Sequence, residues 1–227
     1  MAIIHDTTMN PEKLELLATW MPAQSWILGG GRPPALAKAG GFRLDDPRGE
    51  VGIEFMIVTD GSGGQVTSYL VPMTYRAEAL AAADSALIGT SEHGVLGHRW
   101  IYDGTRDPVL VAQLVALLQG TAEPQAQSVS NTPDPTVTVG SVMDASLTVT
   151  GPVVAADGPS ATDLRADTAA DGARRGQLTV RVNRILRPAG PAGQPGLTAA
   201  WRLPDGTQVR GILATAEHVP GPRPGDH

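Results

Sequence analysis

Residues 51–75, VGIEFMIVTDGSGGQVTSYLVPMTY, contain two apolar runs separated by a glycine-rich turn. The first run, residues 51–58, predicts a β-strand because it is short, rich in β-branched residues and bounded by turn residues. Residues 60–64 read Asp-Gly-Ser-Gly-Gly, which favours a hairpin connection. Residues 65–75 are therefore predicted to return antiparallel to the first strand.

An amphipathic helix is predicted on the N-terminal side of this hairpin. Asn10 suits an N-cap and Pro11 a first helical position, and the sequence EKLELLATWM follows them. The spacing of its apolar residues gives the helix one apolar face and carries it to about Trp20. Pro22 is expected to end it.

The remaining elements of the first half are short, apart from a second helix. That helix is predicted to begin at Asp107 and Pro108, to contain VLVAQLVALLQ and to stop at Gly120. Strands are predicted at 35–44, 86–90 and 97–102, turns at 29–31 and 45–50, and a short alanine-rich helical turn at 79–84.

The second half of the chain is predicted to be rich in strands and to contain no helix. Strands are expected at 137–154, 177–186, 197–203 and 209–214, with polar Pro/Gly-rich loops at 157–175 and 188–196. Hairpins rather than helical crossovers join the strands, so the predicted class is α+β. The predicted organisation is a domain at 1–120, a linker at 121–136, a β-rich antiparallel region at 137–216 and a disordered tail at 217–227.

Composition excludes several classes of function. The chain has 227 residues, a net charge of −6 and no cysteine. The net negative charge argues against binding to nucleic acid or to an anionic membrane. The lack of cysteine excludes disulfides and thiolate chemistry. The acidic N-terminus does not resemble a signal peptide, and no apolar run has the length of a membrane span. We therefore expect a cytoplasmic protein.

Glu92, His93 and His98 are the nearest approach to a metal or catalytic cluster. The HExxH spacing of a zinc helix is absent, and glycines at 94 and 97 disfavour a helix that carries the pair. No G-x-S-x-G sequence supports a serine nucleophile. We expect no metal and no cofactor, and we interpret His93 and Glu92 as residues that hydrogen-bond the turn before strand 97–102.

The tryptophans at 20, 26 and 100 allow two interpretations. Aromatic faces can stack on sugar rings, whereas tryptophans on an amphipathic helix or a strand usually pack between elements. Since Trp20 lies on the predicted helix and Trp100 between Arg99 and Ile101 of a predicted strand, packing is the favoured interpretation.

Several clusters of rare residues occur in an order that resembles one known family. They are WMPAQSW (20–26), LDDPRGEVGIEF (44–55), VPMTYR (71–76) and LIGTSEHGVLGHRWIYDGTRDPV (87–109). Together they resemble the N-terminal cap domain of actinobacterial maltokinases, over about residues 14–120. The resemblance implies a helix packed on a curved antiparallel sheet, reminiscent of cystatins. The family that it resembles also includes stand-alone cap-like proteins, often named in relation to α-glucan metabolism, such as 1,4-α-glucan branching protein.

The chain departs from a kinase of that family in the residues that carry phosphoryl transfer. No lysine follows Lys38, so a strand lysine for the nucleotide phosphates is missing, and His93-Gly94 is followed by Val95 instead of a catalytic aspartate. Gln127–Thr132 faintly resembles the start of a kinase lobe, and residues 121–216 would then be a remnant or a replacement. We expect no kinase activity.

Three hypotheses remain open. The first is a non-catalytic accessory protein that binds a kinase or another enzyme of trehalose, maltose or α-glucan metabolism. The second is a sugar-binding module, and the third is an α-glucan-active enzyme, which needs two facing carboxylates. The candidate binding or structural residues are Trp26, Tyr75, Arg76, Glu92, His93, Arg99, Trp100, Tyr102 and Asp103.

Overall fold

The computed structural model describes residues 9–29, 32–81, 83–129, 131–140, 143–170, 174–189 and 195–221. The α-helices described are α1 (Lys13–Trp20) and α2 (Pro108–Leu118), and the 3-10 turns are η1 (Met21–Ala23), η2 (Asp84–Ala86) and η3 (Gly104–Arg106). The strands of the first half are β1 (Met9–Asn10), β2 (Leu36–Leu44), β3 (Gly52–Asp60), β4 (Thr67–Arg76), β5 (Leu87–His93) and β6 (Gly97–Asp103). Those of the second half are β7 (Gln125–Ala126), β8 (Thr138–Val139), β9 (Thr148–Val149), β10 (Val154–Asp157), β11 (Ala161–Ala170), β12 (Arg174–Asn183), β13 (Ile185–Leu186), β14 (Leu197–Arg202) and β15 (Gln208–Pro220).

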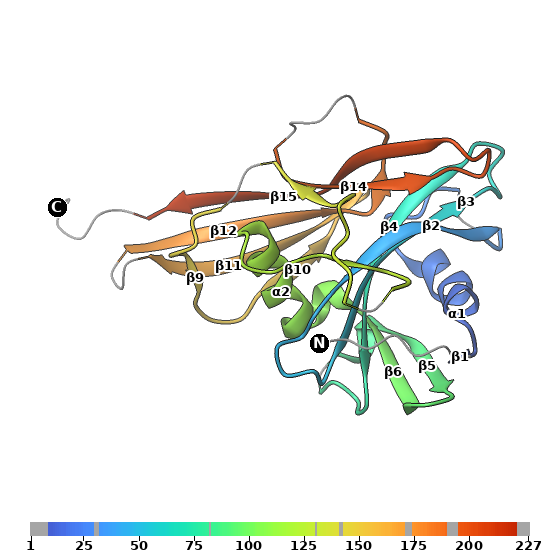
Figure 1. The fold of residues 1–227 in the computed structure, drawn as a ribbon, viewed down its shortest axis with the longest axis horizontal. Coiled ribbons are helices and arrows are strands. Elements are labelled where there is room, and N and C mark those ends of the chain that lie inside the picture. Colours follow the sequence, from blue (N-terminus) through green and yellow to red (C-terminus); the bar gives the residue numbers. More distant parts are fainter. Residues whose placement is uncertain are drawn as a thin grey trace.

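All these strands belong to one antiparallel sheet, which agrees with the predicted α+β class, although the prediction placed the strands of the two halves in separate regions. Most of them follow the order β1-β5-β6-β4-β3-β2-β14-β15-β12-β11-β10, and the short strands β7, β8, β9 and β13 pair with β2, β14, β11 and β4 respectively. The predicted hairpin at 51–75 is β3 and β4, with Gly52 paired to Tyr75 and Asp60 paired to Thr67. Figure 1 shows these strands beside β2, with β3 between β2 and β4 in the order of the sheet.

The sheet closes on itself through two contacts between the halves of the chain. After Arg184, β12 continues as β13, and β13 pairs with β4 at Ile185 and Tyr69. On the other side, β14 pairs with β2 at Trp201 and Gly40. The strands β2, β3, β4, β12–β13, β15 and β14 therefore form a closed ring, an arrangement that leaves few unpaired strand edges.

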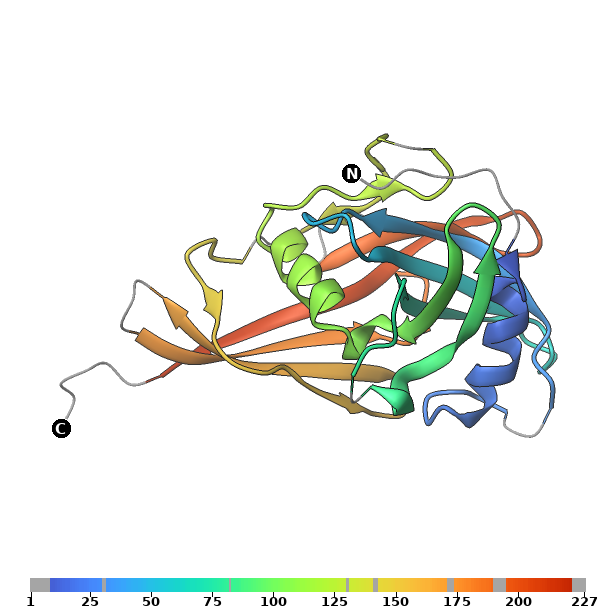
Figure 2. The ribbon, with the colours of Figure 1, turned by 90° about the horizontal axis from the view of Figure 1, so that it is seen from below.

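The interior of this ring is one apolar core to which both halves contribute. α2 packs into it with Leu110, Leu114 and Leu118, all at most 1% exposed. Across the core, Nε1 of Trp201 on β14 donates to Oγ of Ser68 on β4 at 2.9 Å, so both polar groups are satisfied. Figure 2 shows α2 lying against the curved sheet. The other buried members from the first half include Phe42, Leu44, Ile53, Phe55, Ile57 and Leu70, and those from the second half include Leu164, Leu178, Val180, Val182, Leu186, Leu197, Ala199 and Leu213.

α1 covers the opposite face of β3 and β4. Leu17 of α1 and Met21 of η1 are fully buried there against Met56, Val58 and Val71. Successive residues of a strand point to opposite faces, so β3 supplies Phe55 and Ile57 to one core and Met56 and Val58 to the other. This explains why the run at 51–58 is apolar almost throughout.

The predicted linker at 121–136 does not separate two sheets or two cores. β7 lies inside it and pairs with β2, Phe42 opposite Ala126. Regions 1–120 and 137–216 share the closed ring and the core that fills it.

Several predicted boundaries were wrong. Glu12, not Asn10, is the N-cap of α1, in a capping box in which Oε2 of Glu15 accepts from the Glu12 amide at 2.8 Å. In the alanine-rich segment 79–84, residues 79–81 and 83 are not helical, and the 3-10 turn η2 begins only at its last residue, Asp84. The strand predicted at 137–154 is divided into the short β8 and β9 and the start of β10.

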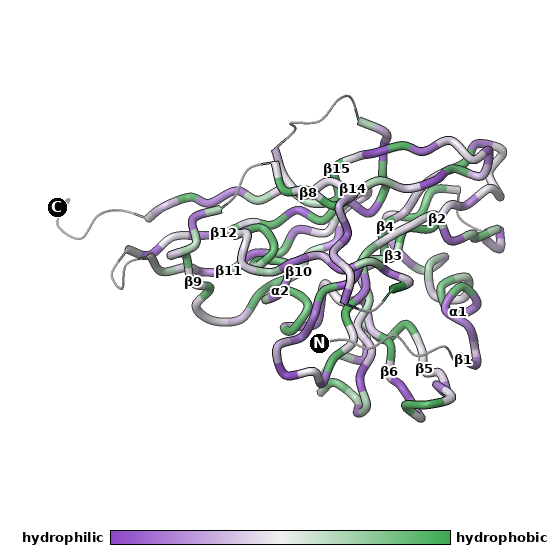
Figure 3. Tube along the Cα trace, in the orientation of Figure 1, coloured by the Kyte–Doolittle hydropathy of each residue, from purple (hydrophilic) through white to green (hydrophobic). Residues whose placement is uncertain are grey.

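The most serious error concerns β11, because residues 157–175 were predicted as a loop. Thr162, Leu164, Ala166 and Thr168 are buried and alternate with more exposed charged residues, which is the period of a strand. Two of the inward positions are threonines, so the alternation is weak in hydropathy (Figure 3).

The tail predicted at 217–227 is only partly described. Residues 217–220 belong to β15, and residues 222–227 lie outside the described residues, as do Gly30 and Gly31 of the predicted turn at 29–31.

Neither helix in the described part of the chain has the length and apolarity that crossing a membrane requires.

Candidate functional site

The predicted site residues do not converge on one pocket. They divide into a buried turn at residues 103–107, a carboxylate cluster around Glu54, and the exposed β5–β6 hairpin. Trp26 belongs to none of these as a surface group, because it is fully buried between Trp20 and Tyr69, with ring centroids at 5.8 and 5.9 Å. Packing, the favoured interpretation of the tryptophans, is what the structure shows for Trp26.

The 103–107 turn follows β6 and is held by the carboxylate of Asp103. Its Oδ1 accepts from the Thr105 amide at 3.1 Å and from the Thr105 hydroxyl at 2.8 Å. Its Oδ2 accepts from Nη2 of Arg184 at 2.5 Å. Asp103 is thus bonded on both sides, to its own turn and to the second half of the chain.

Arg184 is fully buried although arginine is rarely found so. Its Nε donates to Oγ1 of Thr162 at 2.7 Å, and its Cζ lies 5.1 Å from the ring centroid of Trp26. Nη1 of Arg184 and Nε1 of Trp26 are buried without a hydrogen-bond partner among the described residues. No sequence motif marks Arg184, whose partner Asp103 is 81 residues away.

Asp157 continues this contact to the surface. It accepts from Oγ1 of Thr162 at 2.6 Å and from Nη2 of Arg106 at 2.5 Å. Burial alone would raise the pKa of Asp157, but the Thr162 hydrogen bond and the charges of Arg106 and Arg184 outweigh it and lower that pKa. The 103–107 turn is therefore bound directly to β10 and to the β12–β13 junction by polar contacts, and through them to Thr162 of β11.

The last residue of the turn, Asp107, is the predicted N-cap of α2. Its Oδ1 accepts from the Val109 amide at 2.9 Å. Both its carboxylate oxygens also accept from Arg76, each at 2.7 Å, so the pair is bidentate. Tyr102, beside the turn, is buried and its hydroxyl accepts from the Leu80 amide at 2.9 Å.

A second polar cluster lies under α1 around Glu54, which is 3% exposed. Its Oε2 accepts from Nζ of Lys13 at 2.7 Å and from the Tyr75 hydroxyl at 2.5 Å, and Oε1 accepts from Nε2 of Gln127 at 2.6 Å. Burial would raise the pKa of Glu54, but the Lys13 charge and these hydrogen bonds lower it. Burial and the Glu54 charge hold the pKa of Tyr75 well above its ordinary value.

Tyr75 was among the predicted site residues, whereas Glu54 and Lys13 were not. A signal existed, because Glu54 is a lone acid inside an apolar strand and such a residue needs a partner if it is buried.

The β5–β6 hairpin contains His93 and His98, and His93 bonds the turn as predicted, whereas Glu92, predicted to do the same, pairs with His98 across the strands. Nδ1 of His93 accepts from the amides of Val95 at 3.3 Å and Leu96 at 3.0 Å. His98 pairs with Glu92 at 2.5 Å. Arg99 and Trp100 follow on β6, both half-buried, and the Trp100 ring meets the His98 ring edge-on with centroids 4.4 Å apart.

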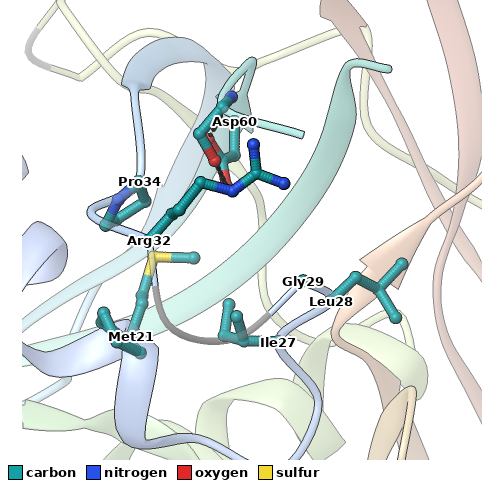
Figure 4. Close-up of a pocket in the computed structure, with 9 residues that line it drawn as sticks. Met21, Ile27, Leu28, Gly29, Arg32, Pro34 and Asp60 are labelled. Carbon is teal, nitrogen blue, oxygen red and sulfur yellow. Dashed lines mark hydrogen bonds between the residues drawn. The ribbon is translucent and has the colours of Figure 1, made fainter. Parts of the chain in front are cut away.

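A small hollow lies between η1 and the start of β2 (Figure 4). Met21, Ile27 and Leu28 line it, and Arg32 and Asp60 stand at its rim. Its empty volume of about 280 Å³ includes space open to solvent. Because that volume counts open solvent, the space that the hollow encloses is far smaller than the roughly 300 Å³ at which sites for drug-sized ligands begin.

Comparison with known proteins bears on the first half of the chain. Residues 20–107 match the family model of the maltokinase N-terminal cap domain. The match ends just before α2 and covers less than half of the chain, within the 14–120 segment that carried the resemblance. No curated protein matches the chain.

Proposed function

We propose that this chain, whose residues 20–107 form a maltokinase N-terminal cap domain, is a non-catalytic accessory protein that binds another protein. One observation carries the proposal: the most buried polar side chains of the cap motifs form hydrogen bonds with other groups of the same chain. Asp103 is bonded to Arg184, Asp107 to Arg76, and Tyr75 to Glu54.

These bonds support a scaffold role because a catalytic group must face the atoms that react. Asp103 and Asp107 are at most 4% exposed, and their carboxylate oxygens accept from groups of the chain itself. Glycoside chemistry, the third hypothesis, needs two carboxylates facing one space. The carboxylates of the 103–107 turn instead face an arginine each.

The partner we propose is a maltokinase or another enzyme of trehalose, maltose or α-glucan metabolism, in the cytoplasm. The support for this choice is the cap domain, which by its name is the N-terminal domain of maltokinases. We also propose, from the same family, that the cap has a cystatin-like fold.

A binding titration of the full chain tests the proposal. The maltokinase and the trehalose synthase of the same organism are titrated into it by calorimetry, with an unrelated sugar kinase as control. We expect a dissociation constant in the micromolar range or tighter for one of the first two and no heat with the control. Absence of a complex with both at micromolar concentration would overturn the partner choice.

The sugar-binding alternative rests on Trp26, Tyr75, His93, Arg99 and Asp103, and it receives less support. Trp26 and Asp103 are buried inside the protein, while His93 lies at the hairpin. A thermal-shift series with maltose and trehalose decides it, since a ligand at 100 times its dissociation constant stabilises the folded state by about 2.7 kcal/mol. An unchanged melting temperature would remove the alternative.

A further inference from the structure

Both faces of the cap's central strands are covered within the chain. On one face of β3 and β4, α1 buries Leu17. On the other face, α2 and the strands β12–β15 complete the closed ring, in which Leu110 of α2 is fully buried. The 103–107 turn is occupied by Arg184 and Asp157. A protein partner must therefore contact the cap elsewhere.

The tip of the β5–β6 hairpin, residues 94–96, is the part of the cap motifs that presents large apolar side chains to solvent. Val95 is 60% exposed and Leu96 is 46% exposed. β4 pairs with β6 only from Trp100 to Asp103, so the hairpin continues beyond the neighbouring strand before it turns. Figure 1 shows the hairpin extending from the body of the sheet, and Figure 3 shows hydrophobic residues at its end.

The tip is held in one conformation by polar contacts of its own. His93 accepts from both exposed residues' backbone amides through Nδ1. Gly97, with φ of +70°, makes the left-handed turn at the start of β6. Glu92 and His98 then pair across the two strands. A loop fixed in this way loses little conformational entropy when it binds, which favours affinity.

The shape and charge of the tip define the partner. Two apolar side chains on a convex turn cannot enclose a small molecule, because ligand sites are concave. Glu92 beside them has a side chain 65% exposed, and the net charge of −6 disfavours an anionic membrane surface. The partner that fits this tip is a protein whose surface has an apolar recess for Val95 and Leu96 and, beside it, a basic side chain that faces Glu92.

Resting on the proposed accessory function, we propose that Val95 and Leu96 are the anchor residues by which this chain docks into an apolar recess of its partner protein. Such anchors are few, and surrounding residues contribute less to affinity. The proposal names a surface, so it can fail while the accessory function stands.

The first experiment replaces the anchors in the full chain. The Val95→Ser/Leu96→Ser variant is titrated into the maltokinase and the trehalose synthase beside Val66→Ser, which alters an exposed valine (48%) on another hairpin. We expect the double variant to raise the dissociation constant at least tenfold, the effect of an anchor residue, and Val66→Ser to leave it unchanged. Circular dichroism and the melting temperature verify that both fold. A complex with equal affinity in both variants would overturn the docking proposal but not the accessory function.

The second experiment places a photo-crosslinking residue at 95 or at 66 of the full chain in living cells of the source organism. We expect one protein, identified by mass spectrometry, to crosslink at 95 and not at 66, and the serine variant to weaken its purified complex. If that protein lies outside sugar metabolism, the docking surface stands and the proposed partner class fails. A missing crosslink at 95, equal crosslinking at both positions, or a crosslink to a second copy of this chain would overturn the proposal.

Discussion

Arg184, between β12 and β13, donates to Asp103 at the end of β6, and neither side chain is more than 5% exposed. The contact joins the cap to the second half of the chain at the point where β12 gives way to β13. The adjacent backbone carries the same connection, since the Leu70 amide of β4 donates to the Arg184 carbonyl at 2.9 Å. The buried pair thus stands where the ring of strands closes.

Replacing Arg184 with methionine should therefore destabilise the whole protein. Asp103 would remain buried without its counterion, and breaking a buried pair in this way costs about 3–5 kcal/mol. Urea unfolding at neutral pH measures the loss, and Arg184→Met/Asp103→Asn should recover part of it because no uncompensated charge remains.

Arg181→Met is the matched control for this prediction. Arg181 also forms a bidentate pair with an aspartate, Asp163, but its side chain is 58% exposed. An exposed pair contributes about 0.2–1 kcal/mol. Equal losses in the two methionine variants would contradict the role assigned to the buried pair.

The parts of the fold predicted from sequence are those with local signals. Turn residues at 60–64 mark the β3–β4 hairpin, and Asp107 and Pro108 mark the start of α2 because capping uses residues adjacent in the chain. The Asn10–Pro11 pair gave a wrong boundary because a second capping arrangement, Glu12 with Glu15, lies two residues further on.

The parts that were missed depend on contacts distant in sequence. Closure of the ring needs Trp201 beside Gly40 and Ile185 beside Tyr69. These residues are far apart in the sequence, and no local pattern predicts that they pair. β11 was missed because Thr162 takes an inward position for its hydrogen bonds with Arg184 and Asp157 rather than for its hydrophobicity. The surroundings of the candidate site residues were missed for the same reason, because their partners, such as Arg184 for Asp103, are distant in sequence.

Gly211→Ala should destabilise the ring of strands from within. A Cβ at Gly211 would lie 2.4 Å from the Arg187 carbonyl oxygen and 2.7 Å from the Trp201 ring. Since the backbone oxygen cannot move cheaply, we expect a loss of about 1–3 kcal/mol, as for overpacked cores. Thermal and urea unfolding measure it. Gly61→Ala is the control, because a Cβ there meets no atom within 4 Å, and a comparable loss at Gly61 would rule out this explanation.

Glu54 should make stability depend on acid pH. Its pKa is lowered in the folded state, so the unfolded chain binds more protons, and the stabilisation present above the unfolded pKa of about 4.3 is lost as pH falls through the folded pKa. Glu54→Gln should be less stable than the natural protein at pH 7, because the contact with Lys13 loses its charge. The difference should narrow toward pH 3.

Urea midpoints between pH 3 and pH 7 measure this difference. Asp46 and Asp157 also have lowered pKa values, so both proteins should lose stability in acid, Glu54→Gln less steeply. Glu50→Gln, at an exposed position, is the control and should follow the natural protein. Parallel curves for Glu54→Gln and the natural protein would show that the buried carboxylate contributes nothing to the acid response.

Asp107→Ala should lower the free energy of unfolding more than a change to an exposed turn aspartate does. Asp107 is fully buried, caps α2 through Val109 and holds Arg76 in a bidentate pair, so the variant loses a cap worth about 1 kcal/mol and leaves a partly buried guanidinium unpaired. We expect a total loss of about 3 kcal/mol, since hydrogen bonds to charged groups contribute about 1.5–3 kcal/mol. Asp205→Ala is the matched control, because Asp205 makes the same kind of turn bond to the Thr207 amide, at 2.9 Å, in an exposed position. Urea unfolding of both variants separates the cases: a small loss at 107, similar to that at 205, would mean that α2 and the cap are held together without this carboxylate.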